Sequence, residues 1–300
     1  ASGPPFCMFV AALFVSRRFN AKLVLDYRDE WTECPFDFVV SGPHDRRWER
    51  KCLGAADAVL FTTESHRRHH LDTFPQLDEQ RAYLIPNGWE DKDFITTHET
   101  LPITAPSSVI TISHVGNLAG HTPPDRFLQA VAELMHQLPE WRSKLRIALI
   151  GPRSQAADKA IRAFPYQDCL QVVDQVGKRE ANQRMQASDV LLLLAVPDLE
   201  RYLPGKLFDY VASRRPILVY GAPGEAFEVV RKLGIGSLCS PEEGSQGLLR
   251  VINDLAQRDI SSHQHKVEDW LQAHRRDVLA KSVFAILLTL LPANVVDARS

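Results

Sequence analysis

Short apolar runs that alternate with helical stretches are the feature that most constrains the fold of this chain. In its first part, β-rich runs cover residues 22–25, 55–61 and 82–85, and each ends abruptly in polar residues. Helical stretches separate the runs, as in βαβ units, whose strands pair in parallel. The sequence therefore predicts an α/β fold with a parallel sheet.

A second series of strands and helices begins near residue 109. The predicted strands cover 109–113, 145–150, 170–173, 190–196 and 216–220, and the predicted helices cover 125–138, 158–164, 179–187, 206–213 and 226–233. In the first of these helices the apolar residues follow the i, i+4, i+7 spacing of a one-sided stripe. This order predicts a second Rossmann-like, doubly wound sheet.

The polar segment 97–108, which contains Pro102 and Pro106 and has no apolar period, is the best candidate for a domain linker. The predicted division is an N-terminal Rossmann-like domain over 1–100, a C-terminal one over 101–276, and a helix and tail over 277–300. Ligands of open α/β sheets bind at the carboxyl ends of the strands. We therefore expect the two domains to face a cleft that holds the active site.

Composition excludes several classes of protein. The 300 residues carry 35 Lys+Arg against 37 Asp+Glu, which argues against disorder and against a nucleic-acid partner. The five cysteines are far apart and form no Cys-x-x-Cys pair, which favours a reducing cytosol. The longest apolar runs, 6–15 and 283–291, are shorter than the roughly 20 residues of a spanning helix. We expect a cytoplasmic protein.

The strongest buried strand leads into Pro204 and Gly205, which open a predicted helix. Amides and the helix dipole attract phosphate at such a position, Gly205 permits close approach, and Lys206 adds a positive charge. Asp209, one turn later, can accept hydrogen bonds from a ribose diol. The alternative is an ordinary Pro-Gly turn whose aspartate offsets the helix dipole.

A similar turn follows the strand that ends near residue 113. Gly116 and Asn117 suit a tight turn with amides that face the same crevice. Gly151 and Pro152 follow the next strand, where the interpretation that we favour is a structural turn.

Four charged and two aromatic residues gather at the end of one strand, over residues 26–31. Arg28 suits a phosphate clamp, while Asp29 or Glu30 suits a bond to a substrate hydroxyl or the role of a base. An internal Arg–carboxylate pair that holds the loop is an equally good interpretation.

Three histidines lie at i, i+3 and i+4, a spacing that can bind metal on a helix: His66, His69 and His70. Cations surround them, so the favoured interpretation is a solvated helix face with no metal. The basic clusters 46–51 and 67–68 are also read as solvated faces, and contact anionic headgroups at a membrane only if the acceptor is lipid-linked.

Seven segments succeed one another in a recognisable order: 2–5, 25–31, 56–63, 85–89 with Phe94, 114–118, 204–210 and 215–218. This order resembles that of the GT-B glycosyltransferases of family 4, which include polysaccharide and glycolipid transferases. The resemblance implies a retaining enzyme that takes a sugar from a nucleotide-diphosphate sugar, without a catalytic metal or other cofactor. The implied acceptor is a glycan, a lipid-linked molecule or a small molecule.

The resemblance also implies roles for individual residues. The implied donor site comprises Gly116, Asn117, Gly205, Lys206, Leu207, Phe208 and Asp209. Arg28 and Asp29 would line the acceptor side and act in catalysis. A C-terminal helix returns to the first domain in many members, and residues 282–291 suit that helix.

Several departures from the family pattern matter. Loop 118–122 has no basic residue to hold the diphosphate, unless His121 or Arg126 substitutes. Arg201 stands where many members carry a glutamate that meets the donor sugar, and Asp209 replaces a longer acid. Members usually have βα units ahead of the segment at 2–5, so we expect an incomplete N-terminal domain.

The leading hypothesis is therefore a glycosyltransferase. The alternative is a non-catalytic nucleotide-sugar-binding or partner subunit with a degenerate transferase fold. A sugar-nucleotide epimerase on the same architecture is a third interpretation, which the order of the motifs disfavours.

Overall fold

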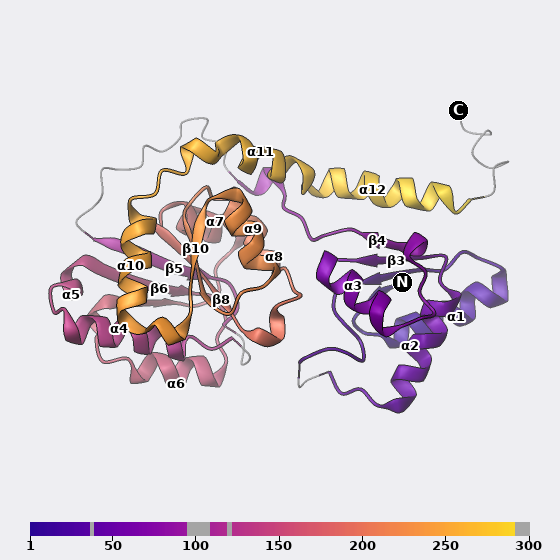
Figure 1. Ribbon diagram of the computed structural model, residues 1–300, viewed down its shortest axis with the longest axis horizontal. Helices are drawn as coiled ribbons and strands as arrows, with labels where there is room; N and C mark the ends of the chain where they lie inside the picture. Colours follow the sequence, from indigo (N-terminus) through magenta and orange to yellow (C-terminus); the bar gives the residue numbers. More distant parts are fainter. Residues whose placement is uncertain (37–38, 95–108, 119–121, 292–300) are drawn as a thin grey trace. The chain divides into compact units, whose positions relative to one another are not determined.

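A computed structural model describes residues 1–36, 39–94, 109–118 and 122–291 (Figure 1). The chain forms two compact units. Unit 1 comprises Ala1–Gly88, Arg201–Leu203 and the chain from Ala273 onward, and unit 2 comprises Trp89–Glu200 and Pro204–Gln272. The boundary predicted near residue 100 lies outside the described residues and stays a prediction.

Unit 1 contains a parallel sheet in the order β1-β2-β3-β4. Its strands are β1 (Ser2–Gly3), β2 (Val24–Tyr27), β3 (Ala58–Phe61) and β4 (Ala82–Leu84), and its helices are α1 (Cys7–Phe19), α2 (Pro43–Ala55), α3 (Glu64–Thr73) and α12 (Arg276–Thr289). Local residues determine where α3 begins and where α1 ends. The side chain of Thr63 accepts a hydrogen bond from the backbone of His66 at the start of α3, and Asn20 ends α1 in the left-handed conformation.

The core of unit 1 is rich in aromatic side chains. Phe9 of α1, Tyr27 of β2 and Phe61 of β3 are fully buried and lie in ring contact. Each such ring buries about 150–250 Å² of surface, so these rings are a large part of this core. The strands of this sheet, and the loops that follow them, are therefore supported by a packed aromatic core.

Unit 2 contains a parallel sheet in the order β10-β9-β8-β5-β6-β7. Its strands are β5 (Ile110–Val115), β6 (Leu145–Ile150), β7 (Leu170–Val173), β8 (Val190–Ala195), β9 (Ile217–Gly221) and β10 (Gly236–Cys239). Its helices are α4 (Asp125–Gln137), α5 (Trp141–Lys144), α6 (Gln155–Ala163), α7 (Lys178–Gln186), α8 (Gly205–Ala212), α9 (Glu225–Leu233), α10 (Gly244–Ala256) and α11 (Gln264–Ala273). Helices lie on both faces of the sheet (Figure 1).

The two parallel sheets confirm the predicted α/β class. Each predicted strand overlaps an observed one, but the pattern indicated neither β1, which has two residues, nor β10, whose sequence Gly-Ser-Leu-Cys is short and only partly apolar. No helix within the described part of the chain is long and apolar enough to cross a bilayer.

The strand order of unit 2 reverses at β5. The chain runs from β5 to β6 and β7 on one side, then crosses to β8, β9 and β10 on the other. In doubly wound sheets, ligands bind at the carboxyl ends of the strands where the order reverses. This point lies between β5 and β8, where the turn at Gly116 meets the start of α8.

Candidate functional site

Gly116 makes the turn at the end of β5, and its backbone conformation requires glycine. Its φ is +132°, and a Cβ there would lie 3.2 Å from Cε and 3.3 Å from Nζ of Lys206. The neighbouring Gly151 has φ +129°, and its Cβ would lie 2.4 Å from the Gly116 carbonyl oxygen. Glycine at both positions lets the two turns approach and leaves room for Lys206, in accord with the structural role expected for the Gly151 turn.

Lys206 projects from the first turn of α8 toward the end of β5. Its Nζ donates to the carbonyl oxygen of Asn117 at 3.2 Å and lies 3.1 Å from Nε2 of His114. Partial burial lowers the pKa of Lys206 to about 8. The ammonium is thus held beside the turn rather than extended into solvent.

The imidazole of His114 accepts a hydrogen bond from the ammonium of Lys206. Nδ1 of His114 lies 3.1 Å from the carbonyl oxygen of Leu192, which can only accept, so Nδ1 carries the proton and Nε2 accepts from Lys206. Burial, followed by the charge of Lys206, lowers the pKa of His114 well below its usual value. The neutral ring therefore positions the ammonium.

Tyr210 connects α8 to the two strands at the reversal point. Its hydroxyl accepts a hydrogen bond from the backbone N–H of Val115 at 2.8 Å and lies 3.2 Å from the carbonyl oxygens of Val115 and Leu192. No role for Tyr210 was predicted from the sequence. Its position one turn after Lys206 in an apolar helix is the signal that could have drawn attention to it.

The other residues of the predicted donor element have different surroundings. Gly205 is exposed, and a Cβ there would meet no described atom within 4 Å, so its backbone borders open space. Asp209 pairs with Lys178 of α7 at 2.5 Å. Leu207 and Phe208 are fully buried, and Phe208 stacks on Trp270, so their side chains belong to the core. If Leu207 and Phe208 contact the donor, they do so through their backbone amides and not through their side chains.

Of the two residues considered as substitutes for a basic loop residue, only Arg126 lies in the described part of the chain; His121 lies outside it. Arg126 is exposed, and its Nη1 lies 3.9 Å from Oε1 of Glu242. The lysine that the structure places at the turn after β5 is Lys206.

Arg28 of unit 1 makes the internal pair that the sequence left open. Its Nε donates to Oδ1 of Asp26 at 2.8 Å, and its Nη2 lies 2.5 Å from the same oxygen. Nη2 also donates to the carbonyl oxygen of Ile85 at 3.3 Å. Arg28 thus ties the end of β2 to the segment after β4.

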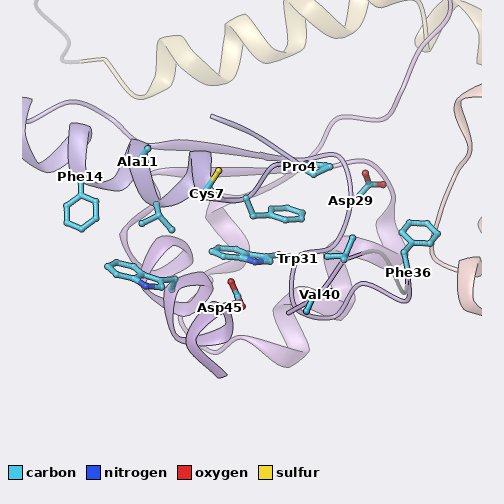
Figure 2. A pocket seen from close by; sticks show the side chains of 13 residues that line it. Pro4, Cys7, Ala11, Phe14, Asp29, Trp31, Phe36, Val40 and Asp45 are labelled. Atoms are coloured by element: carbon cyan, nitrogen blue, oxygen red, sulfur yellow. The ribbon is translucent and has the colours of Figure 1, made fainter. Parts of the chain in front are cut away.

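Asp29 borders a groove of about 730 Å³ in unit 1. Figure 2 shows its largely apolar lining, with Asp29 near Pro4 and Phe36, and Trp31 and Asp45 farther along. Burial, and then the charge of Glu30, raises the pKa of Asp29, while Arg28 opposes the shift. A carboxylate beside apolar walls can accept a hydrogen bond from a hydroxyl while the walls exclude water.

The expectation that the histidines of α3 form a solvated helix face is wrong. His66 and His70 are buried, with 2% and 0% exposure, and only His69 is partly exposed, so α3 does not present them to solvent. Their face packs against Tyr27 and Phe61. Helical spacing alone does not reveal this, because it does not say which side of a helix the sheet covers.

Glu30 and Arg201 form a pair that the sequence did not predict. Both carboxylate oxygens of the fully buried Glu30 accept from Arg201, at 2.7 and 2.8 Å. Arg201, which stands where the family resemblance implies a glutamate that meets the donor sugar, is therefore engaged within unit 1.

This chain resembles known proteins in part of its sequence and in its fold. No protein-family model matches the chain. A D-inositol 3-phosphate glycosyltransferase of Kineococcus radiotolerans is 25% identical over 162 residues. That alignment covers 50% of this chain and 36% of the relative, so the chain spans about a third of the length of the curated relative that it matches.

Solved structures match over almost the whole chain. HepE of Anabaena in complex with UDP has a TM-score of 0.69 at 15% identity, over 94% of this chain and 76% of its own. An E. coli structure described as trehalose-6-phosphate bound with UDP-2-fluoro glucose has a TM-score of 0.71 at 14% identity, over 95% and 72%. Sucrose-phosphate synthase of Thermosynechococcus elongatus has a TM-score of 0.68 at 16% identity, over 94% and 71%. The chain therefore has the α/β fold of the GT-B glycosyltransferases.

Proposed function

We propose that this chain is a glycosyltransferase, or the larger part of one, that moves a sugar from a nucleotide-diphosphate sugar to an acceptor with retention. The observation that carries the proposal is the ammonium of Lys206, held by His114 and Asn117 at the reversal point of the unit 2 sheet. The neighbours solved with UDP and with UDP-2-fluoro glucose support a nucleotide sugar as donor. Donor chemistry is assigned to unit 2 and the acceptor to unit 1.

In the proposed reaction, the bond between the anomeric carbon and the diphosphate oxygen breaks as the acceptor oxygen bonds to that carbon. Negative charge develops on the departing diphosphate, and Lys206 with the first amides of α8 would stabilise it. Asp209 would hold the ribose after sharing or releasing Lys178. The leaving phosphate itself would take the acceptor proton, so a dedicated base is not required.

On the acceptor side, Asp29 is proposed to bind a hydroxyl of a glycan, a lipid-linked molecule or a small molecule. Arg28 is proposed to orient the loop that carries Asp29, since its guanidinium is engaged with Asp26 and Ile85. We further propose that the protein is cytoplasmic and works in polysaccharide or glycolipid synthesis, with membrane contact only if the acceptor is lipid-linked.

Calorimetric titration with UDP, GDP and ADP tests the donor site. One nucleotide should bind, and Lys206→Ala should weaken its binding about ten- to a hundredfold, because a charge-assisted contact is lost. Asp209→Ala should also weaken it. Lys159→Ala, at an exposed lysine of α6, is the matched control and should leave affinity unchanged. If none of the three nucleotides binds at millimolar concentration, the proposal is contradicted.

A non-catalytic nucleotide-sugar-binding or partner subunit is the second candidate. It is favoured by Arg201, which pairs with Glu30 where related transferases place a donor-binding acid. Acceptor-dependent release of nucleoside diphosphate separates the candidates. Turnover by the chain would exclude the subunit hypothesis, whereas nucleotide binding without turnover over a broad acceptor panel would favour it.

A further inference from the structure

Three acidic and imidazole side chains meet inside unit 1: Glu30, His66 and His70. One ligand atom of each lies within 4.8 Å of those of the other two, and all three side chains are buried. Glu30 follows β2, while His66 and His70 lie at i and i+4 on α3, directly after β3. The cluster therefore stands at the carboxyl ends of two neighbouring parallel strands.

Several nitrogen atoms of this cluster lack partners. Nδ1 and Nε2 of His66 and Nε2 of His70 are buried without a hydrogen bond. Buried polar atoms are nearly always paired, since leaving them unpaired costs free energy. Three orphaned atoms on two adjacent imidazoles thus point to a ligand.

The hydrogen bonding of His70 prepares it as a metal ligand. Its Nδ1 lies 3.3 Å from the carbonyl oxygen of His66, which can only accept, so Nδ1 carries the proton and Nε2 has a free lone pair. Metal-binding histidines typically donate their second nitrogen in this way. The same Nε2 lies 3.6 Å from Oε1 of the fully buried Glu49, so a cation bound to this lone pair would lie beside a carboxylate.

The local charge also favours a cation. Two buried carboxylates, Glu30 and Glu49, are opposed by the guanidinium of Arg201. Tyr27 and Thr32 donate neutral hydrogen bonds to Glu49. Both oxygens of Glu30 accept from Arg201, but a carboxylate oxygen has a second lone pair that remains available.

We propose that Glu30, His66 and His70 bind a divalent transition metal ion, of which Zn²⁺ is the best match, with Glu49 as the adjacent carboxylate. Imidazole nitrogen and carboxylate oxygen are standard zinc donors, and i, i+4 histidines on a helix are a recurrent zinc-binding arrangement. The ion would link the loop after β2 to α3. This role is structural and independent of the proposed transferase activity.

Metal analysis of the tag-free protein tests this site. After treatment with chelator and dialysis, the folded chain should take up one equivalent of Zn²⁺, with a rise in melting temperature. Co²⁺ should give the absorption bands of a tetrahedral site. These measurements need no variant, and a folded wild-type protein that takes up neither ion would overturn the proposal.

Variants then assign the site. His66→Gln, His70→Gln and Glu30→Gln should each reduce bound metal to background in protein whose circular dichroism is native. His69→Gln, on the same helix, is the matched control and should retain the full equivalent. Retention of metal by folded His66→Gln and His70→Gln proteins would place the ion elsewhere and overturn the assignment. A protonated His70 paired with Glu49 in metal-free protein, seen by nitrogen NMR together with no metal uptake, would overturn it too.

Discussion

At the residue scale, replacement by alanine should have different effects at Gly116 and at Gly205, the two glycines near Lys206. Gly116→Ala places a side chain at φ +132° and 3.2 Å from Cε of Lys206, so we expect unfolding free energy to fall by about 1–3 kcal/mol and nucleotide affinity to fall with it. Gly205→Ala meets no described atom within 4 Å. It should leave stability unchanged or raise it by up to about 1 kcal/mol, and weaken nucleotide binding if phosphate approaches this backbone.

Urea denaturation and calorimetry of the two variants provide the check. The stability of Gly205→Ala is the internal control for the stability of Gly116→Ala. Equal loss of stability in both would show that the local backbone differs from the one described here. Unchanged nucleotide affinity in Gly205→Ala would argue that phosphate does not approach the start of α8.

The pKa of Lys206 predicts how nucleotide affinity depends on pH. Because burial lowers this pKa to about 8, the lysine is protonated at pH 7 and largely neutral well above pH 8. A diphosphate binds the protonated form, so its affinity should fall as pH rises from 7 to about 9.5. Titrations across this range check the slope, and Lys206→Gln should remove it. A wild-type affinity that is flat with pH would exclude direct contact between Lys206 and the phosphates.

At the element scale, α8 is connected to the carboxyl ends of β5 and β8 by one hydroxyl. Tyr210→Phe leaves the buried N–H of Val115 without its acceptor, so unfolding free energy should fall by about 1–3 kcal/mol. Nucleotide affinity should also fall, since α8 carries Lys206. Tyr166→Phe, at a partly buried tyrosine of the same unit, should change neither quantity by a comparable amount. A Tyr210→Phe protein of wild-type stability would mean that this hydroxyl does not hold the helix.

At the scale of the whole molecule, a short segment of the later chain belongs to the first unit. Arg201–Leu203 lies in unit 1, although its chain neighbours on both sides lie in unit 2. The pair between Arg201 and Glu30 holds it there, together with the bond from Thr63 Oγ1 to the Arg201 carbonyl oxygen at 2.6 Å. Arg201–Leu203 is therefore held in unit 1 by side-chain contacts within that unit.

Arg201→Met should destabilise unit 1 by about 2–3 kcal/mol, because it leaves the charge of Glu30 buried. This loss of unfolding free energy should be smaller than for a fully buried ion pair, because the Arg201 side chain is 24% exposed. The double variant with Glu30→Gln should recover part of the loss. Thermal unfolding in chelator, which removes any contribution from metal, measures both. No recovery in the double variant would mean that the charge pair is not the cause.

The sequence by itself determined the class of fold and most of its elements. The alternation of apolar runs with helices, and the Pro-Gly start of α8, are local patterns that depend on residues a few positions apart. The resemblance of motif order correctly indicated the GT-B fold. Lys206, Gly116 and Asn117 were also brought together as predicted, because strand ends of one parallel sheet meet at one edge.

Only the tertiary structure decided which faces are buried and which charges pair. Arg28 had two open interpretations until Asp26 was found beside it, and His66 and His70 became a buried cluster only once α3 packed on the sheet. The Glu30–Arg201 pair joins residues far apart in the chain. Such contacts follow from packing between distant segments, where the free energy of burying a charge or an imidazole depends on neighbours that no local pattern specifies.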